Sequence, residues 1–309
     1  MEVGKMMFII NPRAGNWLNP KRRNELLNQI RRFFGRGVEI VFSEAEGENS
    51  ISNLAKEAQK NGRTTIVVRG GDGSLNQAVN GLDISDPSIM VGVIPAGTGN
   101  DVASTLGIPW EIKEALRVIA GRHVKQIDLG IANGVRFANT ISIGLDASVN
   151  QIATALKPWF QRLGLSFLAY IAAIGPIMCR KRNDPEVSFE TDSESFKRKI
   201  AFAAVTNCHR YGRGFLVNPK AKVDDGWLNL CILNSVPSLT FPYYALRAKK
   251  GTHVSLTGQF SFHRFKQLKI EVPFPVISQI DGEVHGPLIQ RQVSILPRAL
   301  NIIVPQSQI

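Results

Sequence analysis

Short apolar runs alternate with amphipathic helical patterns over roughly the first 125 residues of the chain. The runs read MMFII, VEIVF, TTIVV and MVGVI, and they are expected to form strands at 6–10, 38–42, 64–68 and 90–94. Apolar residues spaced three or four positions apart predict helices over 18–34, 51–59 and 111–120. Strands that alternate with helices are typical of a parallel sheet, and continuous apolar strands fit burial on both faces. The pattern therefore predicts a doubly wound α/β domain.

The pattern changes after about residue 124, where short runs with β character follow one another. They are expected at 186–191, 199–206, 227–233, 260–265, 268–272, 276–280 and 292–297. Ala132-Asn133-Gly134 adds a hairpin signal, and two helical patterns, at 159–178 and 238–248, interrupt the series. Short strands separated by turns are typical of an antiparallel sandwich. This half is expected to be a β-sandwich domain with helical insertions.

The change of pattern predicts two domains, as does the length of 309 residues at about 150 residues per domain. We place the boundary near Asp128, with an α/β domain over 1–128 and a β-sandwich domain over 129–295. The last segment, 296–309, is expected to complete the first domain.

One stretch, 163–179, is 17 residues long and carries no charge. A membrane-spanning helix needs about 20 apolar residues, and this stretch also contains Gly164, Ser166, Gly175 and Pro176. A core helix is the simplest interpretation. The alternative is a helix that lines an apolar pocket or touches a bilayer, which the neighbouring Trp159 and Arg180-Lys181-Arg182 suit.

The charge excess lies almost entirely in the second half. Residues 1–128 hold 16 Lys and Arg against 14 Asp and Glu, whereas residues 129–309 hold 21 against 11. A basic half favours an anionic partner, and the absence of nucleic-acid-binding signatures leads us to expect no nucleic acid. The three cysteines are odd in number and at least 23 residues apart, which predicts a reducing, cytoplasmic compartment without a disulfide scaffold.

The strongest chemical signal is Gly70-Gly71-Asp72-Gly73-Ser74-Leu75-Asn76, which follows a strand and precedes a helical pattern. Glycines at such a turn let backbone N–H groups approach phosphate oxygens, and the helix N-terminus adds the positive end of its dipole. A carboxylate in a phosphate loop repels phosphate unless a cation lies between them. Asp72 therefore implies Mg²⁺.

Two further loops repeat this logic. Residues 95–101 (PAGTGND) follow the fourth expected strand, and residues 11–16 (NPRAGN) follow the first. The carboxyl ends of parallel strands form one edge of a sheet, where ligands of open α/β proteins bind. The chain has no GxxxxGK[ST] and no GxGxxG followed by an acid, which argues against a P-loop NTPase and a Rossmann dinucleotide site.

At these loops the chain resembles the diacylglycerol kinase catalytic family of lipid kinases, in the superfamily that also includes NAD kinases and, more remotely, phosphofructokinases. The motifs stand in family order: NPRAG, GGDGSLNQAVNGL, PAGTGNDVASTLGIP, QIDLG, KVDDGW and IDGE. The resemblance covers most of the chain. Ala14, Ser74 and Gln77 depart from it, because the family commonly has Ser, Thr and Glu there.

The resemblance implies an ATP site, a catalytic Mg²⁺ site, a structural Mg²⁺ site and a general base. The implied nucleotide contacts are Asn11, Pro12, Arg13, Gly15, Ser43, Gly70, Gly71, Asp72, Gly73, Ser74, Leu75, Asn76, Gly97, Thr98 and Asn100. The implied ligands are Asp72, Asp101 and Asp128 for the catalytic Mg²⁺, and Lys222, Asp225 and Trp227 for the structural one. Glu283 is the implied base, and Asp281 is its rival.

The resulting expectation is an ATP- and Mg²⁺-dependent kinase that phosphorylates a lipid hydroxyl, that of diacylglycerol or a related lipid. Such an enzyme of phospholipid biosynthesis would work in the cytoplasm as a peripheral protein on an anionic membrane, and a homodimer is consistent with the resemblance. One alternative is an NAD kinase-like, soluble small-molecule kinase, against which NPRAG and PAGTGND argue. The other is a lipid- or nucleotide-binding protein without turnover, against which the four acids at 72, 101, 128 and 283 argue.

Overall fold

The computed structural model describes residues 5–15, 19–47, 50–145, 148–149, 152, 155–156, 159, 172 and 183–309. The uncharged stretch 163–179 and the expected helix over 159–178 therefore lie almost wholly outside the described residues. Among the helices within these ranges, none combines the length and the hydropathy needed to cross a membrane.

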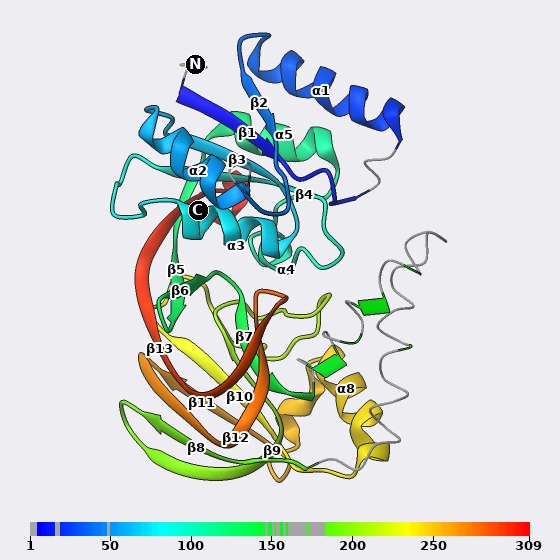
Figure 1. The fold of residues 1–309 in the computed structure, drawn as a ribbon, viewed down its shortest axis with the longest axis vertical. Coiled ribbons are helices and arrows are strands. Elements are labelled where there is room, and N and C mark those ends of the chain that lie inside the picture. The colour runs from blue at the N-terminus through cyan, green and yellow to red at the C-terminus, as the bar shows by residue number, and fades with distance from the viewer. Residues whose placement is uncertain are drawn as a thin grey trace.

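The half of the molecule that contains β1–β4 and α1–α5 is called the first layer here. It is built on a parallel sheet in the order β2-β1-β3-β4. Its strands are β1 (Met6–Ile10), β2 (Glu39–Phe42), β3 (Thr65–Gly70) and β4 (Met90–Pro95). Its helices are α1 (Pro20–Phe34), α2 (Ile51–Lys60), α3 (Asp72–Gly81), α4 (Asp101–Thr105) and α5 (Ile112–Gly121). Strands and helices alternate as the hydrophobic pattern predicts, and they form the upper half of the molecule in Figure 1.

Successive residues of β1 enter two different cores. Met6, Phe8 and Ile10 pack with the apolar faces of α1 and α5, whereas Met7 and Ile9 pack with those of α2, α3 and α4. Side chains alternate between the two faces of a strand, so a wholly apolar strand requires cover on both. Helices lie on both faces of this sheet, which confirms the doubly wound α/β prediction.

The other half of the molecule, which contains β5–β13, is called the second layer. Its strands are mainly antiparallel, and their order is β11-β10-β9-β7-β12-β13. Its strands are β5 (Val124–Ala132), β6 (Val135–Phe137), β7 (Thr140–Gly144), β8 (Glu186–Thr191), β9 (Ser195–Thr206), β10 (Leu228–Asn234), β11 (Phe260–Phe265), β12 (Gln267–Ile280) and β13 (Glu283–Ile303). Short helices η2 (Ser238–Thr240), α8 (Phe241–Lys249) and η3 (Thr252–Ser255) interrupt it, and η4 (Gln306–Gln308) ends the chain. The expected β-sandwich fold with a helical insertion is confirmed, and it encloses its own apolar core.

Two strands are longer than their sequence pattern indicates. The runs expected at 268–272 and 276–280 belong to one strand, β12, whose pairing with β13 is interrupted between Glu271 and Val276. Pro273 and Pro275 fall in this interruption because proline has no N–H to donate to a partner strand. Strand β13 extends far beyond the expected 292–297.

Strand β13 joins the two layers. It pairs with β12 and β5, and near its end Ile302 lies parallel to Val91 of β4. Strand β5 also runs through Asp128 without interruption. In Figure 1 the long red β13 sweeps from the lower half into the upper one. The carboxyl ends of β1, β3 and β4 therefore face residues of the second layer.

Candidate active site

The three phosphate-binding loops predicted from the sequence meet at one edge of the parallel sheet. Asn11 donates from Nδ2 to Ser74 Oγ at 2.9 Å, and its backbone N–H donates to the Arg69 carbonyl at 3.0 Å. The Ala96 N–H donates to the Gly70 carbonyl at 2.8 Å. These bonds hold the loop after β1, the loop after β3 and the loop after β4 against one another.

The loops after β3 and β4 approach each other closely at two glycines, Gly71 and Gly97. A Cβ on Gly97 would lie 2.4 Å from the Cα of Gly71, so glycine is required at this approach. Asn100 closes its loop: its Oδ1 accepts from the Gly97 N–H at 2.8 Å, and its Nδ2 donates to the Gly97 carbonyl at 3.0 Å. Asn100 itself has a φ of 52°, a left-handed conformation that asparagine tolerates.

A buried guanidinium supports the first loop. Arg69, at 8% exposure, donates from Nη1 to the carbonyls of Ala14 at 3.0 Å and Asn11 at 3.4 Å. Burial lowers the pKa of Arg69 from its ordinary value. Arg69 is not among the site residues predicted from the sequence, although it directly follows the apolar run TTIVV.

Asp72 and Asp101 form the acidic pair of the site. Asp72, at the start of α3, accepts from the backbone N–H groups of Asp101 and Val102, each at 3.0 Å. Asp101 accepts from the N–H groups of Arg213 at 2.9 Å and Gly214 at 2.7 Å. Burial, and then the negative charge of Asp101, raise the pKa of Asp72 to about 6.

This pair fits a hydrated divalent cation. Oδ2 of Asp101 and Oδ2 of Asp72 lie 3.1 and 3.3 Å from the point where a Cβ on Gly99 would stand, so the two oxygens converge on space that the glycine leaves open. Mg²⁺ is commonly held by one or two carboxylates with several retained waters. In the part of the chain that the structure describes, no three His, Cys, Asp or Glu side chains are grouped to hold a metal.

The third expected ligand, Asp128, belongs to a different acidic group. Its carboxylate accepts from the N–H groups of Gly226 and Arg298, both at 2.7 Å. Burial is the main cause that raises its pKa, and the negative charges of Asp225 and Asp224 add to it. The structure thus brings Asp72 and Asp101 together and places Asp128 beside the 224–226 turn.

Asp225, an expected ligand of the structural Mg²⁺, makes two hydrogen bonds within the protein. Asp225 accepts from Arg264 Nη2 at 2.7 Å through Oδ2 and from the Trp227 N–H at 3.1 Å through Oδ1. The Arg264 guanidinium also lies 5.2 Å from the centre of a Trp227 ring. Both carboxylate oxygens of Asp225 therefore have protein donors, as those of Asp72 and Asp101 do.

Asp281 and Glu283, the two candidates for the base, differ sharply. Asp281 is 4% exposed, and its carboxylate accepts hydrogen bonds from four donors. These are the N–H groups of Ala138, Asn139 and Thr140 and the Nδ2 of Asn76, at 2.9, 3.0, 2.7 and 3.0 Å. Burial raises the pKa of Asp281 to about 7. This side chain ties the two layers together.

Glu283 is exposed at the start of β13 and faces the glycine loop. Its Oε1 accepts from Gln77 Nε2 at 2.7 Å and lies 3.2 Å from the point where a Cβ on Gly73 would stand. A carboxylate with open space beside it can accept a proton from a substrate hydroxyl, which the enclosed Asp281 cannot do as readily.

Other expected nucleotide contacts occupy structural positions. Leu75 is buried in the apolar core, and the Asn76 amide donates to the Arg136 carbonyl at 2.7 Å as well as to Asp281. Ser43 is buried, and its N–H donates to the Ile10 carbonyl at 2.9 Å. The remaining ones lie on the three loops: Pro12, Arg13, Gly15, Gly70, Gly71, Gly73, Ser74, Gly97, Thr98 and Asn100.

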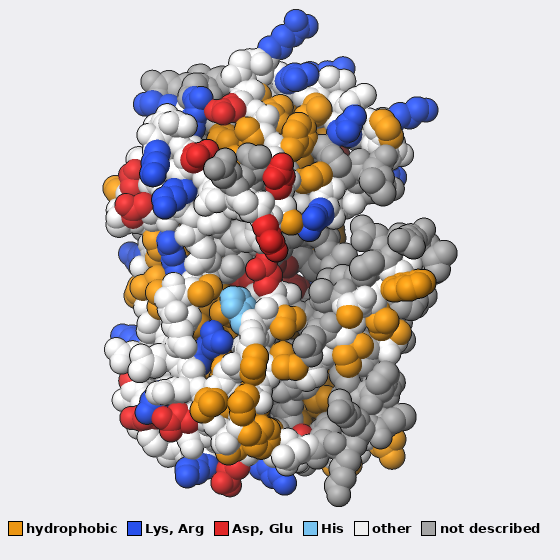
Figure 2. Space-filling model, in the orientation of Figure 1, with side chains coloured by type: hydrophobic (Ala, Val, Ile, Leu, Met, Phe, Trp, Pro, Cys, Tyr) orange, Lys and Arg blue, Asp and Glu red, His pale blue; other side chains and the backbone are white. Residues whose placement is uncertain are grey.

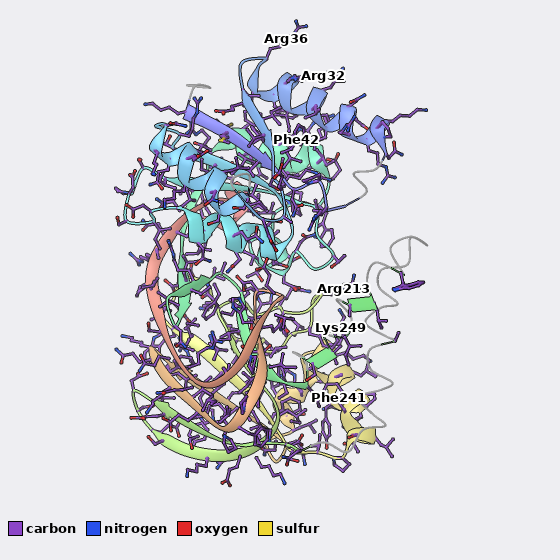
Figure 3. The ribbon with its side chains drawn as sticks, viewed as in Figure 1. Arg32, Arg36, Phe42, Arg213, Phe241 and Lys249 are labelled. Carbon is purple, nitrogen blue, oxygen red and sulfur yellow. The ribbon has the colours of Figure 1, made fainter. Side chains whose placement is uncertain are left out.

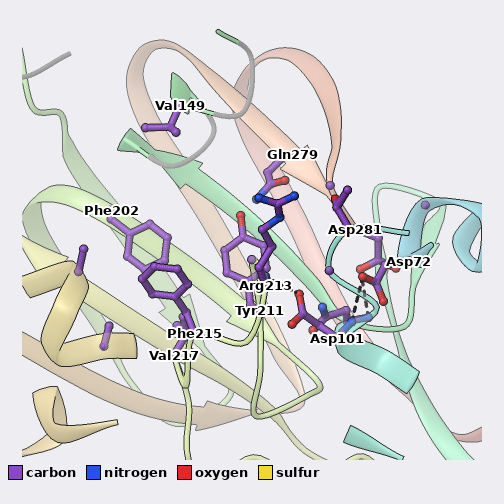
Figure 4. Close-up of a pocket in the computed structure, with 18 of the residues that line it drawn as sticks. Asp72, Asp101, Val149, Phe202, Tyr211, Arg213, Phe215, Val217, Gln279 and Asp281 are labelled. Carbon is purple, nitrogen blue, oxygen red and sulfur yellow. Dashed lines mark hydrogen bonds between the residues drawn. The ribbon is translucent and has the colours of Figure 1, made fainter. Parts of the chain in front are cut away.

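A cavity of about 450 Å³ begins at these loops and continues into the second layer. Its polar end includes Asp72, Asp101, Asp281 and Glu283, and its apolar end includes Phe202, Phe215, Val217, Leu233, Phe241, Tyr244 and Phe260. In Figure 4 the aspartates lie on one side and Phe202, Phe215 and Val217 on the other, with Tyr211 and Arg213 between them. Figure 2 shows acidic side chains gathered near the centre of the molecule, above an apolar region.

The apolar end was not predicted from the sequence. Its residues come from β9, β10, β11, α8 and the 211–217 loop. The sequence alone does not distinguish these residues from ordinary core residues, since the lining of an apolar pocket and a hydrophobic core both consist of apolar side chains. Only the pairing of distant strands places them around one space.

Comparison with protein families agrees with this geometry. The diacylglycerol kinase catalytic domain matches residues 5–132, and the YegS C-terminal NAD kinase beta sandwich-like domain matches residues 139–304. The two matches cover both layers and the loops that meet between them. The chain belongs to the diacylglycerol kinase catalytic family of lipid kinases.

Individual relatives span nearly the whole chain. A diacylglycerol kinase of Bacillus subtilis (strain 168) is 29% identical over 304 residues, which cover 97% of this chain and 96% of the relative. A diacylglycerol kinase of Mycobacterium tuberculosis (strain CDC 1551 / Oshkosh) is 28% identical over 314 residues, or 99% and 96% of the two chains.

Solved structures share the fold of this family member. A crystal structure from Bacillus anthracis str. Sterne matches with a TM-score of 0.78 at 24% identity and covers 99% of this chain and 98% of its own. A second crystal structure from that organism, of a diacylglycerol kinase, has a TM-score of 0.71 at 22% identity with the same coverage. The arrangement of the two layers is therefore common to these proteins.

Proposed function

We propose that this lipid kinase transfers the γ-phosphoryl group of ATP, with Mg²⁺, to the hydroxyl group of diacylglycerol or a closely related lipid alcohol. The observation that carries the proposal is the two-ended cavity. Carboxylates and glycine loops surround one end and aromatic and aliphatic side chains surround the other. A lipid alcohol has the same division between a polar hydroxyl and an apolar chain.

The nucleotide is expected along the three loops at the sheet edge. Their glycines expose backbone N–H groups, and helix α3 begins at Asp72 with its positive dipole end toward the loops. Arg69 donates a hydrogen bond to the Ala14 carbonyl of the loop after β1 and so places a positive charge against that loop. Mg²⁺ bound at Asp72 and Asp101 would neutralise charge on the phosphates during transfer.

Glu283 is the proposed general base. The acceptor hydroxyl gives its proton to the Glu283 carboxylate while the hydroxyl oxygen forms a bond to the γ-phosphorus. The bond from that phosphorus to the bridging oxygen breaks, and ADP leaves with its electron pair. The position of Glu283 beside Gly73 supports this role, because the base and the phosphate loop then border one space.

The acceptor lipid is expected to reach this space from the second layer. Its hydroxyl would lie near Glu283, and its chain would lie among Phe202, Phe215 and Phe260. These rings exclude water and contribute apolar contact area rather than headgroup selectivity. The basic character of residues 129–309 supports binding at an anionic membrane on the cytoplasmic side.

The decisive experiment measures phosphate transfer by the purified full chain. Radiolabelled ATP and Mg²⁺ are offered with diacylglycerol, ceramide, sphingosine, phosphatidylglycerol, undecaprenol or NAD, the lipids being presented in mixed micelles. The expected result is a labelled lipid phosphate, with diacylglycerol the preferred acceptor. Labelling of NAD alone would instead identify a soluble small-molecule kinase. ATP binding without transfer to any acceptor would identify a protein without turnover.

A further inference from the structure

An exposed apolar face follows one side of η2 and α8. Leu239, Tyr243 and Leu246 are 80%, 51% and 57% exposed. They are spaced by four and three residues, so they lie along one side of a single helical segment. We call these three residues the α8 face. None of the residues of α8 is buried, which is unusual for a helix of a globular protein.

The other side of the same helix borders the cavity. Phe241, Tyr244, Ala245 and Ala248 all line it. Helix α8 is therefore a thin wall with apolar side chains on both sides. One side faces the space proposed for the acceptor lipid, and the α8 face is exposed.

The charged residues of α8 and of the sequence on either side of it are positive. Arg247, Lys249 and Lys250 lie at the C-terminal end of α8, and Lys249 and Lys250 are exposed. The surrounding sequence from 226 to 270 contains these three cations together with Arg264, Lys266 and Lys269, and it contains no Asp or Glu. An exposed apolar face with cations at the C-terminal end of its helix is complementary to a surface with anionic headgroups above an apolar interior.

We propose that the α8 face docks on an anionic lipid bilayer, so that the acceptor passes from the membrane into the cavity along this helix. The inference rests on the proposed lipid kinase function and assigns its membrane contact. Leu239, Tyr243 and Leu246 enter the headgroup boundary, and Lys249 and Lys250 approach the phosphates of the lipids.

Helix α8 also contacts the loop that bonds to Asp101. Lys249 Nζ donates to the Arg213 carbonyl, and the Arg213 N–H donates to Asp101 at 2.9 Å. Figure 3 shows Arg213, Lys249 and Phe241 one below another in the lower half of the molecule, with Arg36 at the opposite end. A bilayer in contact with α8 therefore presents lipid close to the polar end of the cavity.

The test is vesicle flotation of the full chain. Vesicles of phosphatidylcholine alone are compared with vesicles of phosphatidylcholine mixed with phosphatidylglycerol. The wild-type protein is expected to float with the mixed vesicles only. Tyr243→Ser combined with Leu246→Ser, and separately Lys250→Glu, should each weaken this binding about tenfold. Trp110→Ser, at an apolar residue that is 54% exposed on the first layer, and Arg36→Glu are the matched controls.

Turnover separates this inference from the proposed function. With a short-chain diacylglycerol in detergent micelles, the α8 variants should retain wild-type rates, and with vesicles they should lose activity in parallel with binding. Undiminished flotation of both α8 variants would overturn the docking assignment while lipid phosphorylation stood. Flotation that needs the α8 face, without phosphorylation of any lipid, would leave the docking and remove the kinase proposal. A dimer that dissociates in the Tyr243→Ser, Leu246→Ser variant would show that a second copy covers the face instead, and would also overturn it.

Discussion

Gln77 of α3 donates a hydrogen bond from Nε2 to Oε1 of Glu283 over 2.7 Å, and this bond joins the helix after the glycine loop to the proposed base. Gln77 stands one helical turn after Gly73. The helix that begins in the glycine loop therefore also orients the Glu283 carboxylate, which lies beside that loop. An amide can donate to a carboxylate, whereas a second carboxylate at this distance would repel it.

Replacing Gln77 should therefore alter the base without altering nucleotide binding. Gln77→Leu is expected to lower kcat about tenfold with little change in the KM for ATP, because the carboxylate loses a hydrogen bond. Gln77→Glu should move the acidic limb of the pH–rate profile to higher pH, because two adjacent carboxylates do not both ionise readily. Gln29→Glu is the control, since Gln29 makes a similar bond to Glu25 on α1. An unchanged pH profile in Gln77→Glu would contradict the positioning role.

Substitutions of the two acids of the 280–283 turn should affect different quantities, turnover for Glu283 and stability for Asp281. Glu283→Gln is expected to lower kcat by about 10²-fold or more while the free energy of unfolding stays the same. Asp281→Asn should destabilise the fold by about 2 kcal/mol, because an amide cannot accept hydrogen bonds from four donors. Steady-state rates and urea unfolding measure the two effects. Loss of turnover at full stability in Asp281→Asn would instead make Asp281 the base.

Magnesium binding should weaken as the pH falls through about 6. Burial and Asp101 raise the pKa of Asp72 to about 6, so Asp72 is protonated below that pH and ionised above it. A proton and a metal ion compete for the same carboxylate, so the apparent Mg²⁺ affinity should fall steeply on the acidic side. The activation constant for Mg²⁺, measured between pH 5 and 8, tests this. Asp83→Asn, an exposed acid outside the cavity, should leave the profile unchanged.

Arg69 should govern ATP affinity through the loop it supports. Arg69→Met removes the hydrogen bonds to the Ala14 and Asn11 carbonyls, and charged hydrogen bonds contribute about 1.5–3 kcal/mol each. The KM for ATP is expected to rise about tenfold or more, with a smaller change in kcat. Arg69→Lys should retain part of the affinity, because an ammonium keeps the charge but not the planar fork. If Arg69→Met lowered only thermal stability, its role would be purely structural.

The elements predicted most accurately are those whose local pattern matches their burial. Strands β1, β3 and β4 are continuous apolar runs buried on both faces, so composition alone identifies them. Much of β13 between Glu283 and Gln292 is exposed, so it lacks such a run. Its strand conformation depends on pairing with β12 and β5, which are distant from one another in the chain. A local pattern carries no information about that pairing.

The same limit applies to the site. The glycine loops were predictable because their backbone needs are local, and the acceptor cavity was not, because its wall comes from separate strands. The grouping of Asp128 depends on the 224–226 turn, whose Gly226 N–H reaches it from 98 positions away in the sequence. The family resemblance implies one Mg²⁺ site for all three aspartates, whereas Asp128 accepts hydrogen bonds from Gly226 and Arg298, and Asp72 and Asp101 accept theirs from other residues.

The backbone contact between two loops gives the sharpest steric prediction. In Gly97→Ala the new Cβ would lie 2.4 Å from the Gly71 Cα and 2.8 Å from Asn100 Oδ1, so the two phosphate loops must separate. Because both loops are proposed to bind the same nucleotide, kcat/KM for ATP should fall about 10²-fold. Gly258→Ala is the matched control: a Cβ there meets nothing within 4 Å, and the substitution should leave turnover unchanged. Wild-type kinetics in Gly97→Ala would show that the close approach of the loops is not needed for nucleotide binding.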